Sequence, residues 1–307
     1  MHVLVAGAGA IGGLLGARLQ SVDHRVTLWT RGEQAEAIHR NGLRIVGSLE
    51  LVSHPEVVTE IRRGASYDLI LFTVKAYDVR EAGAILAEHL PPAPLLALQN
   101  GLGVEDQLRD TMGRGGWASA ADWILRGINT LPAMRTQPGV IRQAGEGEII
   151  LRDPSERSRA DSRTFEKLFL SAHIPVRFTT DLTREIWRKA LVNAAINPVT
   201  ADHRLPNGAL LRDPWRGQAL ALLNEARAVA AQEGMAFTSE EAEADLFRVV
   251  RATAENHSSM LQDVERGRRT EIEAISGEIL RRGRLAGLSL PATERIVGRF
   301  RPSSKTS

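Results

Sequence analysis

The chain has 307 residues, of which 43% are hydrophobic, so it is long enough to form one or two domains that each bury a core. It has no cysteine, which excludes disulfides, thiolate nucleophiles and thiolate metal sites, and its 39 basic and 37 acidic side chains are interleaved, so we expect no nucleic-acid partner. No apolar run approaches the roughly 20 residues of a membrane span, and Gly7 and Gly9 interrupt the first one, so we predict a cytoplasmic protein without a membrane partner.

The first part of the chain alternates between strand and helix patterns. Residues 1–6 (MHVLVA) form a β-rich apolar run, residues 11–19 carry apolar side chains at helical spacing, and residues 25–30 (RVTLWT) return to a strand pattern. Two more strand candidates, at 69–74 and 95–98, flank a helical segment at 79–89. Strands that alternate with helices predict a parallel, doubly wound sheet of the Rossmann type.

The remainder of the chain changes from strands to helices. Short β-prone runs within 129–152 predict added strands or a hairpin in the same sheet, and 174–178 is also β-like. After residue 181 we expect long helices only, at 184–201, 214–233, 239–263 and 270–286. The prediction is an α/β fold with an N-terminal Rossmann domain at 1–180 and an all-helical domain at 181–307. The apolar stripes of the helical half fit either its own core or a homodimer interface.

A glycine-rich sequence directly follows the first predicted strand. It matches G-x-G-x-x-G and consists of Gly7, Ala8, Gly9, Ala10, Ile11 and Gly12. Between a strand and a helix, the first glycine permits the turn, the second lets the backbone approach a pyrophosphate, and the third allows close helix–strand packing, while the helix N-terminus offers N–H groups to the anion. Ordinary turn glycines would not explain this spacing, so we predict a dinucleotide site.

The end of the second predicted strand indicates which dinucleotide binds. NAD-binding domains usually place an Asp or Glu there to hold the ribose 2′-hydroxyl, and residues 26–32 (VTLWTRG) contain neither. Arg31 suits a 2′-phosphate through charge-assisted hydrogen bonds, so NADPH is the predicted cofactor; the alternative is an ordinary exposed loop arginine. The 8 histidines are scattered without ligand spacing, so no metal site is expected.

Several longer motifs occur along the chain: GAGAIG at the start, VKAYDV around Lys75, LQNGLG around Asn100, WRKALVNAAINPVTA from Trp187, PNG at 206–208, and ENHSSMLQDVERGRRTEIEAISG from Glu255. With these motifs the chain resembles the ketopantoate reductase (2-dehydropantoate 2-reductase) family over nearly its whole length. The resemblance implies that NADPH reduces the 2-keto group of ketopantoate to give pantoate, in the pantothenate and coenzyme A pathway. Residues 113–134 match the family poorly, so no cofactor contact is assigned to them.

The resemblance also implies roles for single residues. Lys189 falls on the general acid of the family and Glu271 on its essential acidic residue. Lys75 and Asn100 match positions beside the nicotinamide and the ribose. Substrate contacts fall on Asn193, Asn197, Asn207, Asn256 and Ser259.

Chemistry supports part of this assignment independently. Ketone reduction needs a proton for the developing alkoxide, and a partly desolvated lysine can supply it. Lys189, Asn193 and Asn197 are spaced i, i+4, i+8, which places them on one helix face; a solvent-facing polar stripe is the alternative. We likewise expect Asn256 and Ser259, at i and i+3, to be neighbours on a helix.

The position of Glu271 requires a bend in the chain. On one straight helix it would lie roughly 18 Å from Ser259, too far to share a small substrate. Gly267 is the expected break, and Thr270 with Glu273 forms a T-x-x-E capping box, so we predict a helix that starts just before Glu271. A generic first-turn acid is the alternative.

Three functions are compatible with these features. The first is ketopantoate reduction, and the second is reduction of another 2-keto acid by a paralogous NADPH enzyme, since a few pocket residues set the substrate. The third is a non-catalytic NADPH-binding sensor, against which the presence of both Lys189 and Glu271 argues.

Overall fold

The computed structural model describes residues 1–154 and 159–301, and the chain forms two compact units. The first comprises Met1–Gln99 and Gly103–Leu182, and the second comprises Asn100–Leu102 and the chain from Thr183 onward. The boundary predicted at residue 180 lies close to this division, whereas the transfer of residues 100–102 to the second unit was not expected. Residues 155–158 and 302–307, which belong to the predicted first and second domains respectively, lie outside the described residues.

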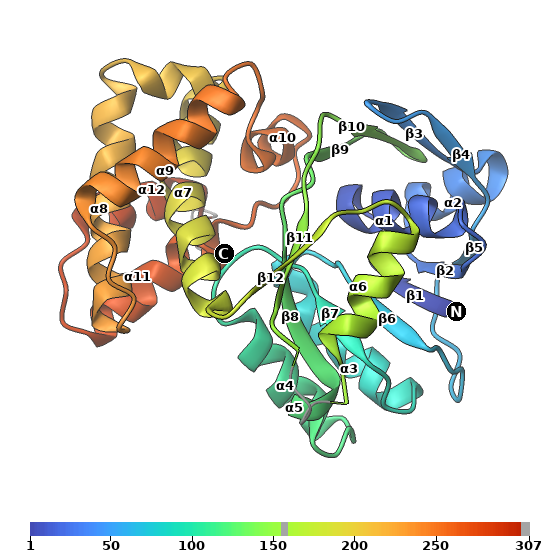
Figure 1. The fold of residues 1–307 in the computed structure, drawn as a ribbon. Coiled ribbons are helices and arrows are strands. Elements are labelled where there is room, and N and C mark those ends of the chain that lie inside the picture. The colour runs from blue at the N-terminus through green and yellow to red at the C-terminus, as the bar shows by residue number, and fades with distance from the viewer. Residues whose placement is uncertain (155–158, 302–307) are drawn as a thin grey trace, which may run out of the picture. The chain divides into compact units, whose positions relative to one another are not determined.

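The first unit is built around an eight-stranded sheet in the order β12-β11-β8-β7-β6-β1-β2-β5 (Figure 1). Its strands are β1 (His2–Ala6), β2 (Arg25–Trp29), β5 (Glu56–Val58), β6 (Leu69–Phe72), β7 (Leu95–Ala97), β8 (Ile124–Asn129), β11 (Ile149–Arg152) and β12 (Val176–Thr179). All neighbouring pairs are parallel except β8 and β11. At the centre, Val3 of β1 is paired with Val26 and Leu69 on its two sides. The predicted doubly wound Rossmann sheet is therefore confirmed.

The hairpin predicted within 129–152 forms part of a second sheet, not of the main one. This sheet has the order β4-β3-β10-β9 and consists of β3 (Leu43–Gly47), β4 (Leu51–Ser53), β9 (Ala133–Gln137) and β10 (Val140–Gln143). Within the predicted stretch 129–152, the strand that does join the main sheet is β11. The small sheet packs on α1 (Ala10–Gln20), where Ile141 occupies the space that a side chain at Gly13 would need. This arrangement depends on pairing between β10 and the distant β3. The local sequence pattern gives no sign of that pairing.

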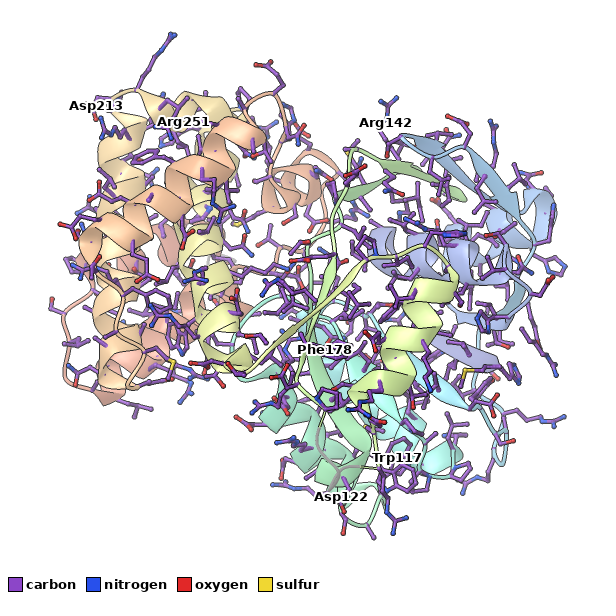
Figure 2. All side chains as sticks on the ribbon, in the orientation of Figure 1. Trp117, Asp122, Arg142, Phe178, Asp213 and Arg251 are labelled. Carbon is purple, nitrogen blue, oxygen red and sulfur yellow. The ribbon has the colours of Figure 1, made fainter. Side chains whose placement is uncertain are left out.

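Helices cover the main sheet of the first unit. They are α1, α2 (Gly32–Asn41), α3 (Val79–His89), α4 (Val104–Arg114), α5 (Ala120–Trp123) and α6 (Ser162–Ser171), with a 3-10 turn η1 (Ala76–Asp78). Leu14, Leu15 and Leu19 of α1 are fully buried in the core, which confirms the helical spacing seen in the sequence. Trp117 is also buried, and its indole N–H donates to Leu90 O at 3.1 Å; it is labelled in Figure 2.

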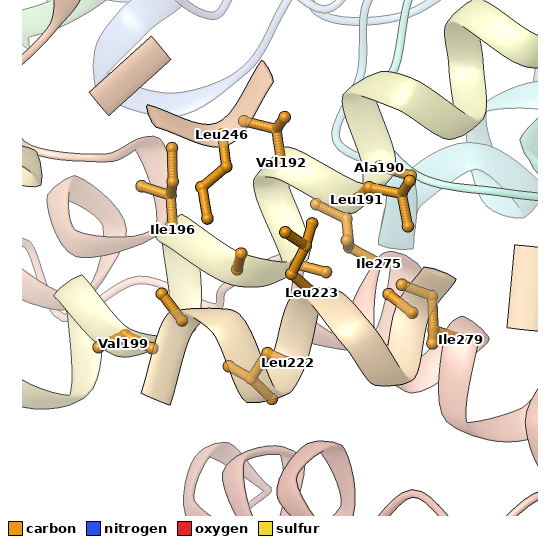
Figure 3. Packing of buried hydrophobic residues seen from close by; sticks show 14 of the residues in the cluster. Ala190, Leu191, Val192, Ile196, Val199, Leu222, Leu223, Leu246, Ile275 and Ile279 are labelled. Carbon is orange, nitrogen blue, oxygen red and sulfur yellow. The ribbon is translucent and has the colours of Figure 1, made fainter. Parts of the chain in front are cut away.

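The described part of the second unit contains helices and no strand. These helices are α7 (Leu182–His203), α8 (Trp215–Gln232), α9 (Ser239–Ala252), α10 (Ser259–Glu265), α11 (Ser276–Leu285) and α12 (Pro291–Phe300), with 3-10 turns η2 (Asn207–Leu211) and η3 (Ile272–Ala274). Apolar residues of α7 such as Leu191 and Ile196 share one core with Leu223 of α8 and Ile279 of α11 (Figure 3). Within the described ranges, no helix has both the length and the apolarity that crossing a membrane requires.

Two of the long helices predicted for this unit are interrupted. The prediction of one helix over 239–263 is wrong, because α9 ends at Ala252 and α10 begins at Ser259. Backbone N–H groups of Asn207 and Gly208 donate to the carbonyls of Asn256 and Ala254 at 3.0 and 2.9 Å, so tertiary contacts hold this connection in a non-helical form. The helix predicted over 270–286 starts only at Ser276, after η3.

Candidate active site

The glycine turn after β1 has the packing expected of a nucleotide-binding loop. Gly7 has φ +102°, and a Cβ there would lie 2.7 Å from the backbone nitrogen of Val74. A Cβ on Gly12 would collide with the carbonyl oxygen of Gly7 and with the hydroxyl of Thr73. Both positions therefore require glycine for close packing.

The second glycine of the motif is not required by packing within the protein. Gly9 is exposed, immediately precedes α1 and has φ −72°, a value that any residue can adopt. A Cβ at Gly9 would meet no protein atom within 4 Å. The open space over Gly9 fits the close approach of a pyrophosphate to the backbone at a helix N-terminus. Of the other motif residues, Ala8 is buried, while Ala10 and Ile11 form the partly buried start of α1.

The remaining cofactor candidates lie at the ends of strands or beyond them. Arg31 immediately precedes α2, two residues after β2, with a side chain 74% exposed and a guanidinium 3.5 Å from Glu81. Lys75 is partly buried and precedes η1, after β6. Asn100 follows β7 and belongs to the second unit, where the neighbouring Leu102 N–H donates to Ala274 O at 3.2 Å.

A pocket in the second unit brings together four of the predicted residues. Asn193 and Asn197 of α7, Ser259 at the start of α10, and Glu271 before η3 all line it. Asn197 is nearly buried, with 8% of its surface exposed. Lys189 lies one turn before Asn193 on the same helix and is partly buried, but it is not among the lining residues. Amide, hydroxyl and carboxylate groups from three separate segments thus converge on one cavity.

The bend that places Glu271 beside Ser259 occurs where it was predicted. Gly267 has φ +61°, and the next residue, Arg268, donates its backbone N–H to Asp263 O at 2.8 Å while its guanidinium lies 3.3 Å from the Asp263 carboxylate. These contacts fold the chain back after α10. The predicted capping box is wrong, however, because the carboxylate of Glu273 accepts hydrogen bonds from Arg301 at 2.7 and 3.1 Å.

Asn256 and Asn207 are placed differently from the four residues in the pocket. The prediction that Asn256 and Ser259 share a helix is wrong, since Asn256 is exposed in the connection between α9 and α10. Asn207 is buried, donates its side-chain N–H to Thr253 Oγ1 at 2.9 Å and is held to Asn256 through the backbone. Ser258 caps α10 by accepting from Leu261 N–H at 3.2 Å, and the hydroxyl of Thr200 in α7 donates to it at 2.8 Å. Asn207 therefore supports the segment that carries Asn256.

Part of the pocket lining was not predicted from the sequence. The additional lining residues are Pro198, Met260, Asp263, Ile272, Ile275 and Ser276. Asp263 could have been predicted from the sequence, because it follows Ser259 at i+4 and so occupies the same helix face. Ile275 and Ser276 were not, since their position depends on where η3 ends and α11 begins.

Both halves of the chain are similar in sequence to known proteins. A sequence model described as ketopantoate reductase PanE/ApbA matches residues 3–156, and the corresponding C-terminal model matches residues 181–303. A 2-dehydropantoate 2-reductase from Archaeoglobus fulgidus is 35% identical over 98% of this chain and 97% of its own length.

Solved structures extend this similarity to the fold. A PanE/ApbA family ketopantoate reductase from Ralstonia eutropha has a TM-score of 0.86 at 28% identity and covers 98% of this chain and 97% of its own. A D-mandelate dehydrogenase solved with NADH and anilino(oxo)acetate has a TM-score of 0.88 at 23% identity, covering 97% and 96%, and so shares the fold. Together with the glycine turn and the polar pocket, these matches show that the chain belongs to the ketopantoate reductase family of oxidoreductases.

Proposed function

We propose that this protein reduces 2-dehydropantoate to pantoate with NADPH, in the pantothenate and coenzyme A pathway. The observation that carries the proposal is the convergence of Asn193, Asn197, Ser259 and Glu271 on one pocket, because the family resemblance assigns these four residues to the substrate or to catalysis. In this proposal the first unit binds the cofactor and the second binds the substrate.

The first unit fits a dinucleotide phosphate cofactor. The open space over Gly9 suits the pyrophosphate, and the exposed guanidinium of Arg31 suits the 2′-phosphate, which has no competing carboxylate at the end of β2. Lys75 and Asn100 would contact the nicotinamide and ribose. Bound NADPH supplies the hydride, and every other function falls to the protein's own side chains.

The residues of the second unit orient the 2-keto acid and manage its proton. Asn193, Asn197 and Ser259 offer hydrogen bonds to its hydroxyl and carboxylate groups, Asn256 completes the proposed set, and Asn207 supports the segment that carries Asn256. The ammonium of Lys189 lies one helical turn from Asn193, donates a proton to the alkoxide oxygen as the carbon is reduced, and stabilises the negative charge that develops there. Glu271 would position this ammonium and the substrate.

Reduction of a different 2-keto acid is the second candidate. The fold is shared with a D-mandelate dehydrogenase that was solved with an oxo acid derivative, so this architecture also occurs in an enzyme for an aromatic 2-hydroxy acid. Small changes in pocket lining suffice to exchange such substrates. Met260, Ile272 and Ile275 are the apolar lining residues that would set the preference.

A steady-state assay of the purified protein separates these functions. NADPH and NADH oxidation are followed at fixed enzyme concentration with 2-dehydropantoate, with the 2-keto acid of mandelate, and with a short aliphatic series. We expect the highest kcat/KM for NADPH with 2-dehydropantoate. A higher kcat/KM for another acid would establish the second candidate, and NADPH binding without turnover of any acid would establish the sensor.

A further inference from the structure

The amide of Gln34 is buried next to the glycine turn, and this residue belongs neither to the glycine motif nor to the family motifs. It lies in the first turn of α2 with 3% of its surface exposed. Its Nε2 donates to the carbonyl oxygen of Ala8 at 2.9 Å, and its Oε1 accepts the backbone N–H of Gly139 at 3.0 Å. One partner is an acceptor and the other a donor, and an amide in this orientation satisfies both.

The two backbone partners of Gln34 come from separate parts of the first unit. Ala8 lies inside the G-x-G-x-x-G turn, whereas Gly139 lies in the turn between β9 and β10 of the small sheet. That hairpin packs against α1 (Figure 1), and the carbonyl of Gly139 accepts the N–H of Arg44 in β3 at 2.9 Å. Gln34 therefore connects the glycine turn to the small sheet through a single side chain.

The bond to Ala8 fixes the direction of the next N–H group. In a planar trans peptide the carbonyl of residue 8 and the N–H of residue 9 point in opposite directions. Holding the Ala8 oxygen toward buried Gln34 therefore turns the N–H of exposed Gly9 away from Gln34. This is the direction from which a pyrophosphate would approach the turn.

We propose that Gln34 is a positioning residue for the cofactor: it locks the Ala8–Gly9 peptide so that the Gly9 N–H faces the pyrophosphate. This inference rests on the proposed dinucleotide function of the turn. It predicts that Gln34 controls affinity for the pyrophosphate part of the cofactor and leaves recognition of the adenosine 2′-phosphate unchanged.

The test compares two ligands in full-length variants. Gln34→Leu removes both hydrogen bonds with little change in size, and Gln143→Leu is the matched control, since Gln143 is a buried amide of the same unit that bonds Gly145 O at 2.9 Å. Dissociation constants are measured for NADPH and for 2′-AMP, which carries the 2′-phosphate but no pyrophosphate. We expect Gln34→Leu to weaken NADPH binding about tenfold or more and 2′-AMP binding less than about twofold, with both ligands unchanged in Gln143→Leu.

A second variant keeps the test valid if Gln34→Leu folds poorly. Gln34→Glu retains the shape and the acceptor for Gly139, but as a carboxylate it cannot donate to Ala8 O. At pH 8 we therefore expect Gln34→Glu to weaken NADPH binding about tenfold or more and 2′-AMP binding less than about twofold.

The outcomes are distinguishable. Equal weakening of NADPH and 2′-AMP, or unchanged NADPH affinity in both Gln34 variants, would overturn the role of Gln34. Failure of the wild-type protein to bind NADPH at all would instead overturn the proposed function.

Discussion

Lys189 is the residue on which the proposed proton transfer depends. It lies on α7, one helical turn before Asn193 and two before Asn197, and the two asparagines line the pocket. The regular helix fixes the order of these groups, while the fold of the segment after α10 brings Glu271 to the same pocket.

Replacing Lys189 with alanine tests this role. We expect kcat for 2-dehydropantoate to fall about 10²-fold or more, because the alkoxide loses its proton donor, while Kd for NADPH stays within about twofold. Stopped-flow turnover and fluorescence titration measure the two quantities. Lys167→Ala, on the exposed face of α6, is the control and should change neither. Near-normal turnover in Lys189→Ala would show that another group supplies the proton.

In the proposed function, Arg31 sets the preference for NADPH over NADH. Its guanidinium is largely exposed and lies 3.5 Å from the carboxylate of Glu81, so a 2′-phosphate could bind it at little cost. We expect Arg31→Ala to lose about 1.5–3 kcal/mol of NADPH binding, roughly 10- to 100-fold in Kd, with little change for NADH. Arg40→Ala, at the other end of α2, should leave both constants unchanged. Equal losses for the two cofactors would remove the basis for the NADPH assignment.

At the level of elements, two glycines of the turn between β1 and α1 should differ in their effects, one on stability and the other on cofactor binding. Gly12→Ala would force a methyl group against Gly7 O and Thr73 Oγ1, so we expect it to destabilise the first unit by about 1–3 kcal/mol.

The methyl group of Gly9→Ala meets no protein atom, so this variant should leave the unfolding temperature nearly unchanged. The methyl group would, however, occupy the space proposed for the pyrophosphate, and we expect it to weaken NADPH binding about tenfold or more. Calorimetry and cofactor titration of both variants check this; full NADPH affinity in Gly9→Ala would place the pyrophosphate elsewhere.

Ion pairs join α7 to α9 in the second unit. Glu241 accepts hydrogen bonds from Arg184 at 2.8 and 2.9 Å and from Arg188 at 2.8 Å, and the bond from Arg184 is the main cause that lowers the pKa of Glu241 below its ordinary value of 4.5. Because the folded-state pKa is depressed, this contribution to stability is present above pH 4.5 and is lost as the pH falls through the lower folded value.

Glu241→Gln tests the pH dependence of this contact. At neutral pH we expect the variant to be less stable by about 1 kcal/mol or less, since the pairs are partly exposed, and we expect the difference to shrink as the pH falls below 4.5. Urea unfolding at several pH values measures it. Glu36→Gln, an exposed residue of α2, is the control with no such difference. A gap that persists undiminished in acid would mean that the carboxylate charge is not the source.

Local patterning was sufficient for elements whose burial follows one regular period. The strands β1, β2, β6 and β7 and the helices α1, α3, α7 and α8 lie within a few residues of their predicted ranges, because the strands are short, buried apolar runs and the helices bury apolar residues at helical spacing. Elements defined by distant partners were missed or misplaced. The β9–β10 hairpin pairs with β3, and the break before α10 is held by backbone bonds from Asn207 and Gly208.

The site was predictable to the same extent. The i, i+4 spacing of Asn193 and Asn197 and the bend at Gly267 could be recognised from residues close in sequence, and the pocket contains the side chains they position. Gln34 could not be recognised, because its two partners lie 26 and 105 residues away along the chain. No periodicity marks a side chain whose role is to orient a distant peptide.

At the scale of the whole molecule, the chain divides the proposed reaction between two units with separate cores. The first has a Rossmann sheet with a glycine turn suited to a dinucleotide, and the second has a helical core with a polar pocket. Residues 100–102 are separated from the end of the Rossmann strand β7 by two residues, yet they belong to the second unit. We propose that these two units serve one hydride transfer.

Transfer of isotope from cofactor to product tests that claim most directly. The wild-type protein is incubated with 2-dehydropantoate and NADPH carrying deuterium in the transferable position at C4 of the nicotinamide, and the product is analysed by mass spectrometry and NMR. We predict pantoate with one deuterium at C2, formed at a rate that drops about 10²-fold in Lys189→Ala. Pantoate without label at C2, or no conversion while NADPH remains bound, would contradict the account.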